Sequence, residues 1–181
     1  LDDLHIDTII GRNWSEFELF LDHLMNDDNF AYYMIFVHNL SYEFQFLRGI
    51  HTFSPDEVFA IKSRKILKCE MFERFEFRCS YLQTNMGLDS FTRKMKVEHQ
   101  KLSGEIFNYS KKRYPWTPLN DYELQYSVND TVGLLEAMHK RMILSNDNLY
   151  TLPLTSTGYV RRETKKAMYG WARKHRDVFP T

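Results

Sequence analysis

The sequence has few cysteines, no long hydrophobic run and no common zinc pattern, and each absence excludes a class of protein. The two cysteines, Cys69 and Cys79, cannot build a disulfide framework, so we expect a reducing, cytoplasmic compartment. Neither CxxC nor HExxH spacing occurs, which argues against a structural zinc site. No apolar stretch approaches the roughly 20 residues that cross a bilayer, and the first residues do not resemble a signal peptide. We therefore expect no membrane partner.

The composition indicates a folded globular chain whose charge is unevenly distributed. The 181 residues are 43% hydrophobic and 15% aromatic, and the formal net charge is zero. Residues 1–30 nevertheless carry eight acidic side chains and one basic one, whereas residues 159–176 carry seven basic side chains and one acidic one. Such asymmetry is typical of a basic end that contacts phosphate, or of a solvated helix face. We expect one domain over residues 1–150, followed by a basic helical segment at 151–181.

Hydrophobic periodicity predicts an α/β protein with a mixed sheet. Alternating apolar and polar residues predict an antiparallel meander of three strands between residues 57 and 79. The strongest helix is predicted for residues 120–144, with Asn120 as N-cap and Glu123 completing a capping box. The other predicted elements are a helix at 15–25 capped by Ser15 with Glu18, a strand at 31–37, a helix at 41–47 with Ser41 near its cap, a short helix at 88–94 and a basic helix at 158–175.

Two acidic side chains are candidates for metal chemistry. Tyr126 and Asp130 are four residues apart, so they share one face of the long helix. Glu43 and Asn39 follow the predicted strand at 31–37, and the carboxyl edge of a sheet is where α/β proteins build their sites. Carboxylates from separate elements, each beside a tyrosine, suit two-metal phosphodiester hydrolysis. The simpler interpretation of the helical pair is an amphipathic helix with a half-buried tyrosine and a solvated carboxylate.

Several short motifs carry a resemblance to one protein family. HNLSYEFQFL, at residues 38–47, resembles the second exonuclease motif of family B DNA polymerases, and YSVND, at 126–130, resembles their third. In KLSGEIFNYSKKRYP, Lys101 and Tyr109 resemble the lysine and the following tyrosine of the same exonuclease site. The CSYLQT stretch resembles the single-strand-binding motif through Ser80 and Leu82, with the spacing changed by one residue. The chain as a whole resembles the 3′–5′ proofreading domain of a protein-primed phage-type DNA polymerase.

This resemblance implies a fold, an activity and a set of site residues. The fold would be ribonuclease H-like, and the chain would form part of a DNA polymerase in a bacterial or phage setting. Mg²⁺ or Mn²⁺ would be the cofactor, and the partners would be a single-stranded DNA 3′ end, template-primer DNA and a priming terminal protein. Asp130 and Glu43 would hold the metal ions, Tyr126 would position the attacking water and Lys101 would support the scissile phosphate. The residues implied to bind the DNA strand are Asn39, Tyr42, Ser80, Leu82 and Tyr109.

The sequence departs from the family pattern at two places. Glu43 stands where the second motif has aspartate, and the D-x-E of the first motif is absent ahead of residue 15. The only D-x-E, at residues 121–123, is interpreted as a helix cap. We therefore expect a fragment that lacks both the first motif and the polymerase domain, with 151–181 as the link toward that domain, and with weak or no nuclease activity by itself.

Two other functions remain open at this point. In the first, the chain is a non-catalytic nucleic-acid-binding module that grips phosphates through the basic residues at 111–113 and 159–176. In the second it is a nucleophilic hydrolase, which the absence of a G-x-S-x-G elbow disfavours. His38 is interpreted as a core or strand-end residue rather than as a ligand.

Overall fold

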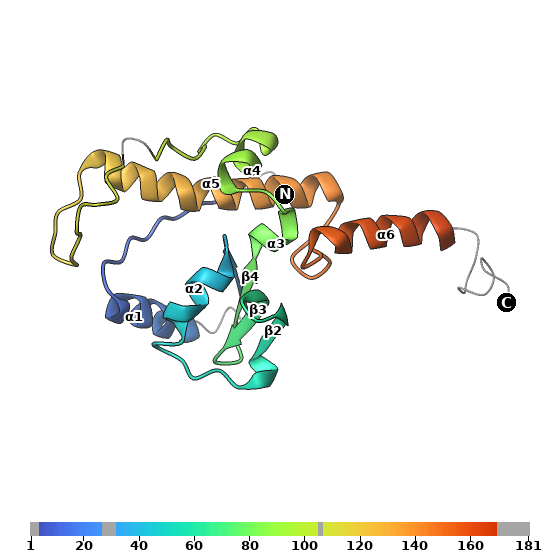
Figure 1. Cartoon of the computed structure of the whole chain (residues 1–181), viewed down its shortest axis with the longest axis horizontal. Coiled ribbons are helices and arrows are strands. Elements are labelled where there is room, and N and C mark those ends of the chain that lie inside the picture. The colour runs from blue at the N-terminus through green and yellow to red at the C-terminus, as the bar shows by residue number, and fades with distance from the viewer. Residues whose placement is uncertain (1–3, 27–31, 105–106, 170–181) are drawn as a thin grey trace.

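A four-stranded mixed sheet forms the centre of the computed structural model, which describes residues 4–26, 32–104 and 107–169 (Figure 1). The strand order is β1-β4-β3-β2, in which β1 runs parallel to β4 and the other neighbours are antiparallel. The strands are β1 (Tyr33–Val37), β2 (Val58–Lys62), β3 (Lys65–Met71) and β4 (Phe75–Cys79), with the 3-10 helix η1 (Pro55–Glu57) before β2. The mixed sheet and the predicted meander are thus confirmed. Residue 31 of the predicted first strand lies outside the described residues.

The first helices cover the sheet and share a core with it. α1 (Trp14–Met25) and α2 (Leu40–Leu47) contribute Leu21, Leu40 and Leu47, which pack with the buried side chains of β3 and β4. The predicted cap of α1 is wrong, because Asn13 accepts the hydrogen bond from the Glu16 amide at 3.0 Å, which leaves Ser15 inside the first turn.

The start of α2 also differs from the prediction. Asn39 occupies the N-cap position in the left-handed region, with φ 68°, and its side chain makes no capping hydrogen bond. Asparagine tolerates this conformation better than most residues. Ser41 lies inside the helix, where its hydroxyl accepts a hydrogen bond from the Ile66 amide of β3 at 3.0 Å. The serine therefore fastens α2 to the sheet instead of capping it.

A second core lies where β4 leads into the helices that follow. The helices α3 (Ser80–Thr84), α4 (Leu88–Met95) and α5 (Asp121–Ser145) succeed it in the chain, and Phe91, Ala137 and Met138 are fully buried between α4 and α5. α5 begins as predicted, because Asn120 and Glu123 form a reciprocal capping box. Phe36 of β1 packs on this second core, whereas its neighbour Ile35 packs on the first, as side chains alternate along a strand.

The carboxyl ends of β1 and β4 point toward α5, which runs across that end of the sheet (Figure 1). α6 (Ser156–Tyr169) then extends away from the body; residues 170–175 of the predicted basic helix lie outside the described residues. Its first half is tied back to the domain, since Arg162 pairs with the buried Asp147 and Arg141 contacts the hydroxyl of Tyr159 at 3.1 Å. Among the described residues, none of the helices is both long and apolar enough to cross a membrane.

Candidate functional site

Four of the predicted site residues meet on one side of α5. Lys101 Nζ donates hydrogen bonds to both carboxylate oxygens of Asp130, over 3.1 and 3.0 Å. The same ammonium lies 5.2 Å from the centre of the Tyr126 ring. The hydroxyl groups of Tyr126 and Tyr109 are hydrogen-bonded at 2.8 Å. The structure therefore brings together side chains from the segment before α5 and from the helix itself.

The helix positions two of these groups by its own geometry. Tyr126 and Asp130 lie one turn apart, and Tyr126 is only 7% exposed because its ring packs against Phe107, with 4.6 Å between ring centres. Lys101 and Asp130 are each 30% exposed at the side chain. The result is a tyrosine fixed by packing beside an ion pair that solvent and ligands can reach.

The ion pair sets the charge state of the cluster. Burial lowers the pKa of Lys101, but its hydrogen bonds to Asp130 and Tyr126 and the negative charge of Asp130 raise it by more, so the net pKa lies above its ordinary value. Burial raises the pKa of Tyr126, and the hydrogen bond with Tyr109 raises it further. At neutral pH Lys101 is charged and Tyr126 is neutral, and the ammonium of Lys101 already balances the negative charge of Asp130. A divalent cation at Asp130 must compete with Lys101.

A row of α5 residues holds the segment that carries Lys101. Asn129 donates a hydrogen bond to the carbonyl of Gln100 at 2.8 Å, and Glu136 accepts one from the His99 amide at 3.0 Å. Between them lies Gly133, where an added Cβ would stand only 2.0 Å from the His99 carbonyl oxygen. The chain at 98–101 thus runs directly over the helix, and a glycine is required for this close approach. The spacing of the three residues places them on one helical face.

His38 neighbours the cluster from the sheet side. It follows the last residue of β1, and its Nδ1 lies 3.1 Å from the hydroxyl of Ser80. Burial lowers the pKa of His38, the positive charge of Lys101 lowers it further, and the negative charge of Asp130 partly opposes this. The imidazole is therefore neutral at neutral pH and within electrostatic reach of the ion pair. The prediction of a strand-end residue agrees with its position but missed this proximity.

Glu43 is a partly buried carboxylate without a counter-charge. It lies on α2 between the buried Leu40 and Leu47, and burial raises its pKa. Within the described residues its side chain makes no hydrogen bond or ion pair, so the structure does not link it to Asp130 through a direct contact.

Two other residues with a predicted role lie at the start of α2, beside the turn between β2 and β3. Asn39 and Tyr42 border a groove of about 770 Å³, together with Arg48 and Arg64. Neither arginine forms an ion pair with any side chain in the described ranges. Tyr42 is 56% exposed, and its ring lies edge-on to Phe46 at 5.5 Å. An exposed aromatic ring beside two uncompensated guanidinium groups is a surface suited to an anionic, ring-bearing ligand.

Ser80 and Leu82 have structural contacts. Ser80 is fully buried, and its hydroxyl donates to the Val37 carbonyl at 3.3 Å, which ties the ends of the parallel strands β1 and β4 together. Leu82 packs partly buried against the first core. Tyr81, between them, is 40% exposed and lies edge-on to His38 at 5.7 Å between ring centres. Of this motif, it is Tyr81 that reaches the solvent, which the sequence did not single out.

The basic residues before α5 are largely occupied within the chain. Lys111 and Arg113 both donate to Glu123, at 3.0 and 2.7 Å. The Asn120 amide and these two cations lower the pKa of Glu123 to about 2. The D-x-E at 121–123 thus caps the helix, as predicted. Glu123 also anchors the preceding loop, so two of the three cations at 111–113 are not free to bind phosphate.

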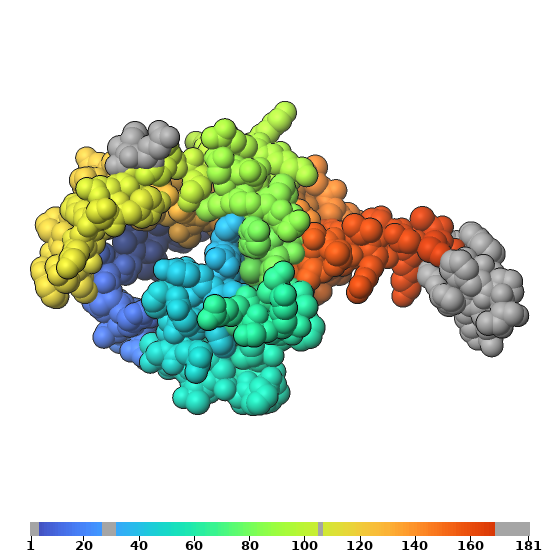
Figure 2. Space-filling view, viewed as in Figure 1, coloured from blue at the N-terminus to red at the C-terminus, as the bar shows by residue number. Residues whose placement is uncertain are grey.

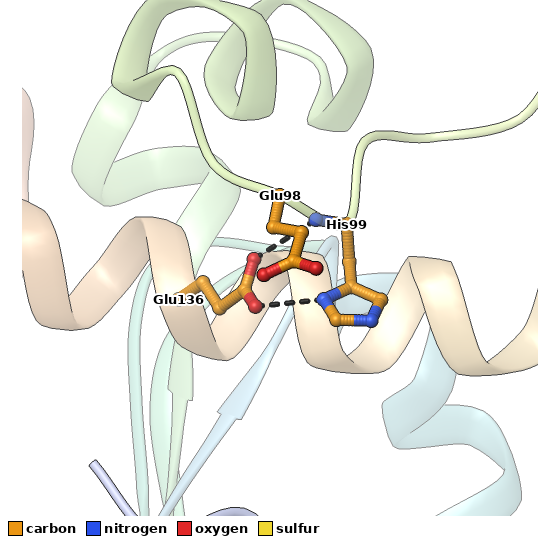
Figure 3. Close-up of side chains that lie close together, drawn as sticks. All are labelled: Glu98, His99 and Glu136. Carbon is orange, nitrogen blue, oxygen red and sulfur yellow. Dashed lines mark hydrogen bonds and ion pairs between the residues drawn. The ribbon is translucent and has the colours of Figure 1, made fainter. Parts of the chain in front are cut away.

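A further set of metal-type ligands was not predicted from the sequence. Glu98, His99 and Glu136 offer ligand atoms that lie within 4.8 Å of one another, and in the described ranges they are the sole group of three or more such residues (Figure 3). Short-range spacing rules for zinc sites do not detect this set, because 37 positions separate His99 from Glu136. Glu43 and Asp130, the predicted metal ligands, do not belong to it.

Comparison of the chain with protein-family models, with curated proteins and with solved structures found no match.

Proposed function

We propose that this chain is the 3′–5′ exonuclease domain of a DNA polymerase, which binds single-stranded DNA 3′ ends and hydrolyses phosphodiesters with two metal ions in the full-length protein. The single observation that carries the proposal is the cluster of Lys101, Tyr109, Tyr126 and Asp130, since these are the residues that the resemblance assigns to one site and they are in mutual contact. A ribonuclease H-like fold is part of the proposal, and the parallel β1–β4 pair within a mixed sheet supports it.

The donor atoms fit the expected cofactor. Carboxylate oxygens are the ligands that Mg²⁺ and Mn²⁺ prefer. Burial disfavours the charged form of Glu43, and among the described residues no cation pairs with it. Asp130 and Glu43 would hold the ions, whose chemistry is to activate water and stabilise the leaving oxygen. Tyr126, held neutral by its surroundings, would orient the water through its hydroxyl, and Lys101 would offer its ammonium to the phosphate.

The surface around these residues suits a single strand. The molecule is hollowed between α2, which carries Glu43, and the side formed by α5 and the segment before it (Figure 2). Two tyrosines with a predicted role expose their rings: Tyr109, before α5, is 69% exposed and Tyr42, on α2, is 56% exposed. Bases of a single strand stack on such rings without sequence preference. The uncompensated Arg48 and Arg64 beside Tyr42 would bind the phosphates.

The experiment that tests the proposal measures metal-dependent strand binding, because we expect weak or no cleavage by this chain alone. Binding of a 3′-labelled single-stranded oligonucleotide is followed by fluorescence anisotropy with and without Mn²⁺. We expect Mn²⁺ to tighten binding for the natural chain and for the control Asp121→Asn, which alters a carboxylate in the first turn of the same helix. Asp130→Asn should bind equally with and without Mn²⁺.

Two outcomes would redirect the proposal. Binding that ignores Mn²⁺ in every variant would favour the alternative of a non-catalytic nucleic-acid-binding module, which needs no cation at Asp130. Clear Mg²⁺-dependent 3′–5′ degradation that Asp130→Ala abolishes would support the exonuclease and show that the expectation of weak activity is wrong.

A further inference from the structure

Glu98, His99 and Glu136 form a compact set of metal-ligating groups away from the Lys101–Asp130 pair. Two of the residues lie on the segment that follows α4, and the third lies on α5, so the set joins two parts of the fold (Figure 3). His99 Nδ1 donates a hydrogen bond to one carboxylate oxygen of Glu136 at 2.7 Å. The side chain of Glu98 points toward the same carboxylate (Figure 3). The three donor groups therefore converge from different directions on one small volume.

The geometry of the set is fixed by the backbone rather than by chance contact of long side chains. The second carboxylate oxygen of Glu136 accepts the His99 amide at 3.0 Å, which orients the carboxylate. The close approach at Gly133 holds the His99 carbonyl against α5, and Asn129 holds the next carbonyl at 2.8 Å. A ligand set that is oriented before the ion arrives loses less conformational entropy on binding.

The charge of the set is unbalanced. Glu98 makes no side-chain hydrogen bond or ion pair with any residue in the described part of the chain, and the partner of Glu136 there is His99. With a neutral imidazole, the two carboxylates carry a charge of about −2 that a divalent cation would neutralise. One imidazole with two carboxylates is a donor set that Zn²⁺, Mn²⁺, Co²⁺ and Ni²⁺ accept, whereas Mg²⁺ favours oxygen ligands and retained water.

We propose that Glu98, His99 and Glu136 form a transition-metal site that is distinct from the proposed exonuclease centre. His99 would bind through Nδ1, with its proton moved to Nε2, and one oxygen of each glutamate would complete the set. The bound ion would replace the His99–Glu136 hydrogen bond and fasten the segment 98–101 to α5. Because Lys101 is the last residue of that segment, the ion would also hold Lys101 beside Asp130. The site stands or falls independently of the exonuclease proposal.

Cobalt absorption spectroscopy tests the site, because the visible bands of Co²⁺ report on inner-sphere nitrogen and oxygen ligands. Titration of the full chain should give one equivalent of Co²⁺ whose visible bands show an imidazole ligand, and Zn²⁺ but not Mg²⁺ should displace this ion. Glu98→Gln should weaken Co²⁺ binding by more than roughly 10-fold, a loss that even outer-sphere partners of a metal can cause. Glu98 is exposed, so this variant keeps the fold, which circular dichroism verifies. His99→Gln should abolish the imidazole contribution to the spectrum.

Matched controls separate this site from the other proposal. His139→Gln removes an imidazole one turn from Glu136, and Asp121→Asn removes a carboxylate of the same helix that belongs to neither proposed site; both should bind Co²⁺ like the natural chain. The site is overturned if the natural chain binds no Co²⁺ at millimolar concentration, or if Glu98→Gln and His99→Gln bind it unchanged. Loss of Co²⁺ binding in Asp130→Asn alone would instead assign the ion to the exonuclease centre and would equally overturn a separate site.

Discussion

Replacement of Gly133 by alanine should destabilise the protein, although alanine is the better helix former. In the middle of α5 the substitution itself favours the helix by about 1 kcal/mol. The new Cβ, however, would stand 2.0 Å from the His99 carbonyl oxygen, which must retreat by about 1.4 Å to reach the 3.4 Å of an ordinary contact. Such a movement breaks the hydrogen bonds made by Asn129 and Glu136, at about 1 kcal/mol each.

Overpacking adds about 1–3 kcal/mol, so the net loss should be about 2–4 kcal/mol. For a protein of this size that corresponds to a fall in Tm of about 4–16 °C. Thermal and urea unfolding of Gly133→Ala, monitored by circular dichroism, measures this loss of stability. Thr131→Ala is the control, because Thr131 lies exposed on the same helix and alanine meets no obstacle there. If Gly133→Ala is as stable as Thr131→Ala or more so, the tight contact between residues 98–101 and α5 is refuted.

Three further predictions concern ion pairs. Lys101→Met removes the cation that competes with Mn²⁺ for Asp130. Titration calorimetry should show Mn²⁺ binding that is about two- to five-fold tighter, which corresponds to the free energy of a partly exposed ion pair. Unchanged affinity would show that Asp130 does not bind the ion. Glu123 has a folded pKa of about 2, so its ion pairs stabilise the fold above its ordinary pKa and this effect is lost as the pH falls toward 2. In urea unfolding, the stability of Glu123→Gln should therefore depend less on pH in that window than the stability of the natural chain does. The same pH dependence in both proteins would contradict this prediction. Arg162→Met leaves Asp147 buried and unpaired, so Tm should fall and α6 should be cleaved sooner in limited proteolysis; unaltered cleavage would show that this pair does not anchor the helix.

The parts of the fold that depend on local pattern were predictable from the sequence. Alternation of apolar side chains located the β2–β3–β4 meander, and the capping box at Asn120 located the start of α5 to within one residue. The caps of α1 and α2 were mispredicted because asparagine and serine are both good N-caps and stand two residues apart at each site. Local propensity does not decide between two adjacent candidates, whereas the path of the incoming chain does.

The candidate site was predictable only where one element carries it. The four-residue spacing put Tyr126 and Asp130 on one face, and the structure agrees. Lys101 came from the family resemblance, since nothing in its own neighbourhood indicates that it reaches α5. The approach of residues 98–101 to Gly133, and with it the Glu98–His99–Glu136 set, depends on the path of an irregular segment over a helix. Periodicity contains no information about such a path.

The two carboxylates proposed to bind metal differ in a way that stability measurements can detect. Asp130 is compensated by Lys101, whereas burial raises the pKa of Glu43, which pairs with no cation in the part of the chain that the structure describes. When the pKa of a carboxyl is higher in the folded state than in the unfolded state, the protein becomes less stable as the pH rises above the unfolded pKa, because the unfolded state ionises first. Glu43→Gln should therefore stabilise the metal-free chain at neutral pH, and the gain should vanish at a pH where Glu43 is protonated. Mn²⁺ should raise the Tm of the natural chain by more than that of Glu43→Gln, because only the natural chain carries both carboxylates of the proposed centre. An equal response of both proteins to Mn²⁺ would mean that Glu43 is a buried structural carboxylate and that the second motif does not bind metal in this chain.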